Sequence, residues 1–76
     1  MNEAKLYILI GEKIRKLREL QGVSQQDLAA KCDFEKSNMS RIEAGRTNLT
    51  IKTLYKISLA LNISIHDLLD FESNIL

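Results

Sequence analysis

Apolar residues recur at helical spacing along almost the whole chain, and this periodicity limits it to folds built from helices. In the first stretch, Ile10, Ile14 and Leu17 follow one another at steps of four and three. Such spacing puts them on one face of an amphipathic helix. The run from Leu6 to Ile10 could alternatively form a short strand, but no second strand-like run offers it a partner. We therefore predict helix there as well.

Residues that begin and end helices divide the chain into five segments. Ser24, Thr50 and Ser64 are suitable N-caps because a hydroxyl can accept a hydrogen bond from the first helical turn. Ser24 and Ser64 are each followed three residues later by Asp, a weaker form of the capping box. Gly22 favours a helix end, since glycine readily takes the left-handed conformation. The predicted helices are residues 3–21, 24–32, 35–44 and 51–61, and a short one that begins at residue 64.

The apolar stripe of each segment predicts which side chains face the core. They are Ile10, Ile14, Leu17 and Leu20; Leu28, Ala29 and Cys32; Met39 and Ile42; and Ile51, Leu54, Ile57 and Leu61. The last segment carries Ile65, Leu68, Leu69 and Phe71. The connections between segments are short, about 2–6 residues, as in small helical domains. We therefore predict an all-α fold, a compact five-helix bundle that contains a helix-turn-helix.

The length and the cysteine count narrow the class of protein further. A chain of 76 residues suits one domain, residues 1–76, which is small for a cleft that holds both cofactor and substrate. Its one Cys cannot form an internal disulfide and fits a reducing compartment such as the cytoplasm. The longest apolar run has five residues, far short of a membrane span, and no signal peptide is visible.

The sequence has only one Cys and one His and contains no recognisable catalytic motif. Cys32 lies on an apolar stripe, so we interpret it as a small core residue rather than a reactive thiol. His66 lies in the first turn of the last segment, where we expect a solvated residue rather than a ligand. One Cys and one His cannot supply a zinc site, and no phosphate-binding glycine motif occurs. We predict no enzyme activity, no metal, no cofactor and no small-molecule ligand.

The second and third segments carry the most information about function. Two short helices joined by a tight turn at residues 32–34 have the dimensions of a helix-turn-helix unit. The outer face of the third segment carries Lys36, Ser37, Ser40 and Arg41, side chains that can hydrogen-bond to bases or phosphates. An ordinary solvated face would have the same composition, so this pattern alone leaves both interpretations open.

Several strings together resemble a known family. SQQDLAAKC at residues 24–32 and SNMSRIEAGR at 37–46 are preceded by GEKIRKLRELQGV at 11–23 and followed by NLTIKTLYKISLALN at 48–62. In this order and spacing they strongly resemble the Cro/phage-repressor type (XRE-like) helix-turn-helix family, over roughly residues 10–70. The string NLTIK also resembles, more weakly, the controller proteins of restriction–modification systems. The resemblance implies a sequence-specific DNA-binding transcriptional regulator, such as a repressor, in the cytoplasm of a bacterium or a phage host and associated with the nucleoid.

The resemblance also implies roles for individual residues. The third helix would enter the major groove of double-stranded DNA. Its matching positions would contact bases: Lys36, Ser37, Asn38, Ser40 and Arg41. Phosphate contacts would come from the start of the second helix and from the loop after the third: Gln25, Arg46, Thr47, Asn48 and Lys52. Arg18 and Glu43 match a pair that forms an ion bridge between the first and third helices, although Arg18 as a DNA-contacting cation and Glu43 as a base reader is an alternative.

Members of this family bind as dimers to operators with two half-sites, so we predict a homodimer on a pseudo-palindromic operator. The last segment is the first candidate for the interface, with Ile65, Leu68, Leu69 and Phe71, followed by Ile75 and Leu76 and rimmed by Asp67, Asp70 and Glu72. These residues could instead close the bundle. Leu6, Tyr7 and Leu9 are a second candidate patch. An alternative function is an antitoxin that binds a toxin protein and autoregulates its own operon.

The two ends of the chain differ in charge. The formal net charge is only +1. All 11 Lys and Arg residues lie within residues 1–56, together with seven acids, whereas residues 57–76 hold three acids and no base. A basic part suits phosphate binding. The acidic, apolar end suits a partner subunit held away from DNA.

Overall fold

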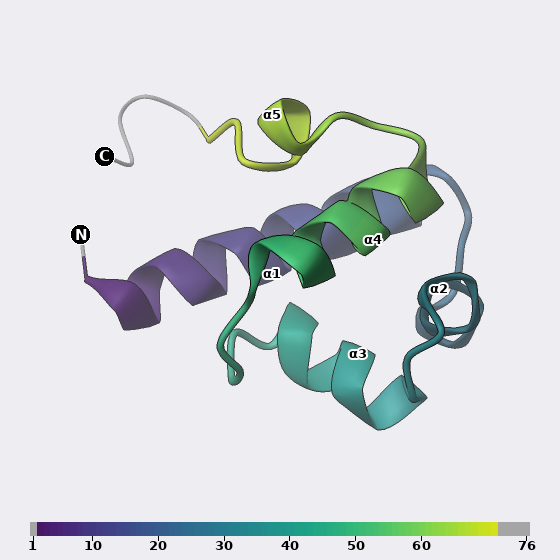
Figure 1. The fold of residues 1–76 in the computed structure, drawn as a ribbon, viewed down its shortest axis with the longest axis horizontal. Helices are drawn as coiled ribbons and strands as arrows, with labels where there is room; N and C mark the ends of the chain where they lie inside the picture. Colours follow the sequence, from purple (N-terminus) through teal and green to yellow (C-terminus); the bar gives the residue numbers. More distant parts are fainter. Residues whose placement is uncertain (1, 72–76) are drawn as a thin grey trace.

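The computed structural model describes residues 2–71 (Figure 1). It contains five helices in that range: α1 (Glu3–Leu20), α2 (Gln25–Cys32), α3 (Lys36–Glu43), α4 (Ile51–Leu61) and α5 (Ile65–Leu68). The all-α fold is therefore confirmed, and the first four predicted helices agree with the structure to within one residue at each end. Glu72, Ile75 and Leu76, named above for the dimer interface, lie outside the described residues.

The helices begin and end where local side chains satisfy the backbone. The hydroxyls of Ser24, Thr50 and Ser64 accept hydrogen bonds from the backbone N–H three residues later, at 3.0, 3.1 and 2.9 Å. These three predicted N-caps are confirmed. Gly22, after the end of α1, has φ +69°, the left-handed conformation that the sequence predicted.

Each helix packs on the others through the stripe that its sequence marks as apolar. Figure 1 shows α4 lying in front of α1, with α3 below, α2 seen end-on to one side and α5 above α4. α1 contacts α3, α4 and α5, and α2 contacts α3 and α4. The buried apolar side chains between them are Ile10, Ile14, Leu28, Ala29, Cys32, Met39, Ile42, Leu54, Ile57, Leu61 and Leu68. None of the helices within residues 2–71 is long and apolar enough to cross a membrane.

The prediction that Leu20 and Ile51 face the core is wrong. Leu20 is 74% exposed and Ile51 is 70% exposed. Leu20 lies about 120° around α1 from Ile14, because six residues of an α-helix stop about 120° short of two full turns. Ile51 is the first residue of α4 and is exposed at the end of the helix, although Leu54 three residues later is buried. Residues spaced three apart move gradually around the helix, so the first or last residue of such a stripe can lie off the face that packs on the core.

Leu68 also differs from its predicted role. It was expected at a dimer interface, but its exposed fraction is 0% because it packs into the core of its own chain. Its neighbours Leu69 and Phe71 are half-buried and pack against the same core. Much of the apolar surface of this segment therefore closes the bundle, which was the alternative interpretation of these residues.

Two helices, α1 and α3, approach each other closely at Gly11. This residue is buried in α1, and a Cβ placed there would lie 2.5 Å from the carbonyl oxygen of Glu43 and 2.6 Å from that of Ile42. Only a residue without a side chain allows the last turn of α3 to lie this close to α1. The sequence analysis missed this role of Gly11, although a glycine inside an amphipathic helix is the signal that could have found it.

Candidate nucleic-acid interface

The turn between α2 and α3 is held by its own backbone and by the core beneath it. Asp33 takes the left-handed conformation, with φ 60°. The backbone N–H of Phe34 donates to the carbonyl of Ala29 at 2.8 Å. Leu28 of α2 and Met39 of α3 are fully buried on the inner side. The two helices therefore form a helix-turn-helix unit that presents its other side to solvent.

The solvent side of α3 carries four exposed polar side chains: Lys36, Ser37, Asn38 and Arg41. The ion pairs described within residues 2–71 involve other residues. The side-chain hydrogen bonds described in that range also involve residues other than these four. We call these four residues the outer face of α3. Their donors and acceptors are available to a partner outside the chain.

A second polar group lies in the loop between α3 and α4 and in the first turn of α4. Arg46, Asn48 and Lys52 are exposed, and Thr47 is half-buried. The backbone N–H of Arg46 donates to the carbonyl of Arg41 at 2.9 Å, which fixes the loop to the end of α3. Two cations and two small polar groups therefore follow the outer face of α3 directly.

Arg18 of α1 and Glu43 of α3 form a buried ion pair. Arg18 Nε donates to Glu43 Oε2 at 2.7 Å, and Arg18 Nη2 donates to Glu43 Oε1 at 3.0 Å. The two residues are only 9% and 7% exposed. A third bond, from Arg18 Nη1 to the carbonyl of Val23 at 2.8 Å, ties the end of α1 to the turn before α2. Both residues are therefore inside the protein, away from the position of a DNA contact.

Arg18 keeps its positive charge over the ordinary pH range. The hydrogen bonds that Arg18 donates to Glu43 raise the pKa of Arg18 above its usual value, whereas burial of the guanidinium acts in the opposite direction. A bidentate bond of this kind fixes two planar groups with respect to each other. The pair consequently fixes the end of α3 against α1.

Gln25 and Ser40 belong to the same network. Gln25 Nε2 donates to Glu43 Oε1 at 3.0 Å, and the Ser40 hydroxyl donates to Gln25 Oε1 at 2.8 Å. The sequence analysis placed Ser40 on the side of α3 that points away from the core. In the structure Ser40 is half-buried, on the side of α3 that meets α2. No local sequence pattern indicates a bond between side chains 15 positions apart on two helices.

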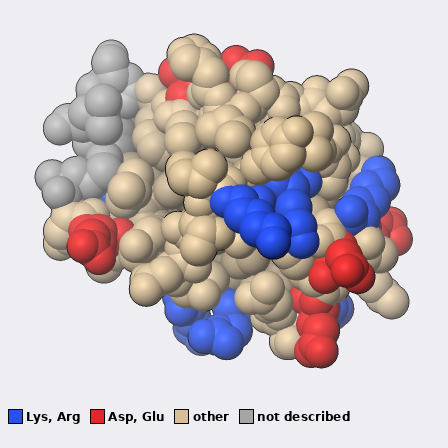
Figure 2. Space-filling model, viewed as in Figure 1, with Lys and Arg blue, Asp and Glu red and all other residues tan. Residues whose placement is uncertain are grey.

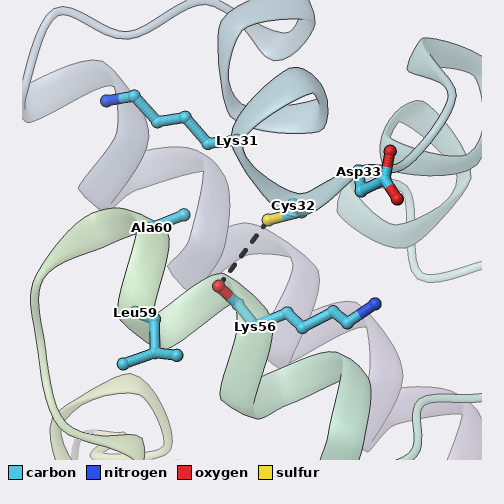
Figure 3. A pocket seen from close by; sticks show the side chains of 6 residues that line it. All are labelled: Lys31, Cys32, Asp33, Lys56, Leu59 and Ala60. Atoms are coloured by element: carbon cyan, nitrogen blue, oxygen red, sulfur yellow. Dashed lines mark hydrogen bonds between the residues drawn. The ribbon is translucent and has the colours of Figure 1, made fainter.

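A shallow hollow lies between the end of α2 and α4 (Figure 3). It is lined by Lys31, Cys32, Asp33, Lys56, Leu59 and Ala60. The Cys32 thiol donates to the carbonyl of Lys56 at 3.7 Å, and Cys32 is only 3% exposed. Burial raises the pKa of this thiol, with a smaller opposite effect from the charge of Lys56. Cys32 is therefore a core residue, as its place on an apolar stripe predicted.

A family model described as HTH_3, helix-turn-helix, matches residues 14–68. The match covers the last two turns of α1 and every later helix. The chain belongs to this helix-turn-helix family. The resemblance to that family inferred from the sequence is confirmed.

Relatives within the helix-turn-helix family include controller proteins and other regulators. The chain is 40% identical over 65 residues to Control protein C.BamHI of Bacillus amyloliquefaciens, which covers 84% of this chain and 80% of the relative. The solved structure of the restriction-modification controller protein C.AhdI from Aeromonas hydrophila superposes with a TM-score of 0.80 and 31% identity, over 86% of this chain and 97% of that one.

A second regulator also matches. The HTH-type transcriptional regulator SinR of Bacillus subtilis is 41% identical over 63 residues, which are 82% of this chain and 57% of SinR. A solved structure of SinR in complex with DNA superposes with a TM-score of 0.74 over 80% of this chain. Together with the family, these relatives show that the chain is a helix-turn-helix transcriptional regulator. They do not favour the antitoxin alternative.

Proposed function

We propose that the chain binds double-stranded DNA through the outer face of α3, which enters the major groove. The observation that supports this most is that four polar side chains of α3 are exposed to solvent and have no bonding partner within residues 2–71. Lys36 and Arg41 offer cationic donors that suit guanine, and Asn38 offers an amide that suits adenine. Ser37 can reach a base or a phosphate. The solved structure of a relative, SinR, in complex with DNA supports DNA binding by this chain.

The phosphate contacts of the proposed complex come from the loop after α3. Arg46 and Lys52 supply positive charge, and Thr47 and Asn48 supply small donors beside it. Phosphate contacts fix the register of a protein on DNA, whereas base contacts give specificity. The two groups adjoin in the structure, because Arg46 is bonded to the backbone of Arg41.

We also propose that the chain acts as a homodimer on a pseudo-palindromic operator, since one eight-residue helix covers only a few base pairs. The surface best suited to a second copy is an exposed apolar stripe along α4. Ile51, Tyr55 and Leu59 follow at steps of four and are 70%, 54% and 61% exposed. We call these three residues the α4 stripe. Of the interface residues predicted from the sequence, Ile65, Leu69 and Phe71 are half-buried and would flank it.

Charge supports a second copy of this chain on the α4 stripe. Lys56 lies on α4 beside the stripe, while Asp67 and Asp70 lie in and after α5. Figure 2 shows basic side chains in the middle of this face and acidic ones at its upper edge, near α5. In a two-fold dimer each copy offers the same patch, so a patch with both signs can complement itself.

The type of regulator follows from its relatives. Likeness to C.BamHI and C.AhdI over most of their lengths supports a controller protein of a restriction–modification system, acting on DNA in the cytoplasm. Regulation would then depend on the concentration of the chain and on its dimerisation.

Selection of bound sites from random duplex DNA tests the proposal. We expect an enriched pseudo-palindromic motif, and an affinity that falls steeply when the salt concentration is raised, because bound cations release counterions from DNA. Arg41→Ala is expected to relax the preference at one base position in each half-site. Lys16→Ala, which removes an exposed cation on α1, is the matched control. An absence of any enriched motif would rule out the regulator.

A further inference from the structure

The amide of Gln25 connects the first residue of α2 to two positions on α3. Its nitrogen donates to Glu43, and its oxygen accepts from Ser40. We propose that Gln25 and Ser40 are positioning residues: they set the rotation of α3 and so determine operator specificity without themselves reading a base. This inference rests on the proposed DNA binding and assigns these two side chains a role different from direct contact with DNA.

Two bonds at different heights on α3 restrain it more than one would. Ser40 and Glu43 are three residues apart, so they lie one above the other on the same side of the helix. A planar amide bonded at both ends opposes both rotation of α3 about its axis and sliding along it. Glu43 is in turn held by two bonds from Arg18, so the restraint extends to α1.

The bonding groups of both residues are already engaged. Ser40 has a single hydroxyl proton, and it is donated to Gln25. The Gln25 oxygen accepts that proton, and one of its two amide hydrogens is donated to Glu43. One amide hydrogen of Gln25 is left, so a phosphate contact is the competing interpretation that an experiment must separate. The neighbouring Gln26 is exposed and makes no such bond within residues 2–71.

A small rotation of α3 would be enough to alter base contacts. Side-chain tips lie about 6 Å from a helix axis, so a turn of about 20° moves them by about 2 Å. That displacement exceeds the tolerance of a hydrogen bond. Loss of the amide link would therefore weaken contacts made by Lys36 and Arg41, although neither touches Gln25 in the structure.

The test compares affinity for the selected operator duplex with affinity for a scrambled duplex of the same length. We expect Gln25→Ala and Ser40→Ala each to lower the ratio of the two affinities by about tenfold, mainly because binding to the operator duplex weakens. Because the two residues share one bond, the double variant is expected to show no further loss. Ser40→Thr keeps the hydroxyl and is expected to retain the ratio. Gln26→Ala is the matched control and is expected to leave it unchanged.

Other outcomes would overturn the inference. If Gln25→Ala weakened binding equally on both duplexes while Ser40→Ala had no effect, Gln25 would be a phosphate contact. If the two losses were additive, each side chain would act on DNA independently. A melting temperature close to that of the wild type in both variants separates positioning from unfolding. A wild-type protein that fails to prefer any selected duplex would instead refute the proposed DNA binding itself.

Discussion

Glu43 is the residue on which the position of α3 depends most. Its carboxylate accepts hydrogen bonds from Arg18 and Gln25, which belong to two other helices. With a side chain only 3% exposed, it has almost no contact with solvent. A buried carboxylate is tolerated while its charged partner, Arg18, is present.

Glu43→Ala is expected to destabilise the fold before it affects recognition. The change leaves the guanidinium of Arg18 buried without its partner, which costs roughly 3–5 kcal/mol. At about 4–8 °C per kcal/mol for a domain of this size, the melting temperature falls by at least about 12 °C. Thermal unfolding followed by circular dichroism measures this. Glu12→Ala, at an exposed position of α1, is the control. An unchanged melting temperature with lost DNA binding would instead make Glu43 a base reader.

The thiol of Cys32 is expected to be unreactive in the folded protein. Burial raises its pKa, so near neutral pH it stays protonated, and the thiolate is the form that alkylating reagents attack. Labelling with iodoacetamide is expected to be slow in buffer and fast in denaturant. Rapid labelling of the folded protein would contradict the buried position.

Because the pKa of Cys32 is raised, the stability of the fold is expected to fall at alkaline pH. Since the pKa of Cys32 is higher in the folded state than in the unfolded one, the folded state holds the proton longer. The contribution to the unfolding free energy is complete below the ordinary thiol pKa and is lost as pH rises through the folded pKa. Urea unfolding at neutral and alkaline pH is expected to show this loss. Cys32→Ala is expected to show a smaller one.

At the scale of helices, local signals were enough to place the elements. Hydroxyl N-caps, the glycine after α1 and the apolar periodicity act within one or two turns of backbone, and the predicted ends match to within one residue. They could not show which turns of a helix extend beyond the core. Leu20 and Ile51 followed the pattern and are nevertheless exposed.

Gly11→Ala is expected to destabilise the protein, although alanine is the better helix former by about 1 kcal/mol. The added methyl group would meet backbone atoms of Glu43 and Ile42 at 2.5 to 2.8 Å, so α1 and α3 must move apart. Overpacking of this kind costs about 1–3 kcal/mol. Gly22→Ala is a useful comparison, because that position is open and carries only the strain of a positive φ. A more stable Gly11→Ala variant would contradict the close approach.

At the scale of the whole molecule, charge is unevenly distributed along the chain. The bases gather in the part of the chain that forms α1 to α4, and the segment from residue 57 onward has acids only. The outer face of α3 and the α4 stripe are formed by different helices. The proposed surfaces for DNA and for a second copy therefore lie mainly on different helices.

The α4 stripe is expected to control the oligomeric state. Light scattering coupled to size exclusion at micromolar concentration is expected to give twice the 8.7 kDa mass of the chain. Tyr55→Glu and Leu59→Glu each place a charge in the apolar contact and are expected to give monomers. Leu20→Glu, which changes an exposed leucine at the end of α1, is expected to leave the dimer intact. A dimer that survives both α4 variants but not Ile65→Glu would move the interface to α5.

The sequence by itself determined the helices, their caps and most of the core, because these depend on contacts between residues a few positions apart. It also determined the family, through motifs spread along the chain. Only the tertiary structure decided which polar groups bond to each other. Ser40 to Gln25, Gln25 to Glu43 and Arg18 to Glu43 span 15, 18 and 25 positions. Such bonds require the exact packing of three helices, which periodicity does not encode, and they separate the side chains that position α3 from those left free to reach DNA.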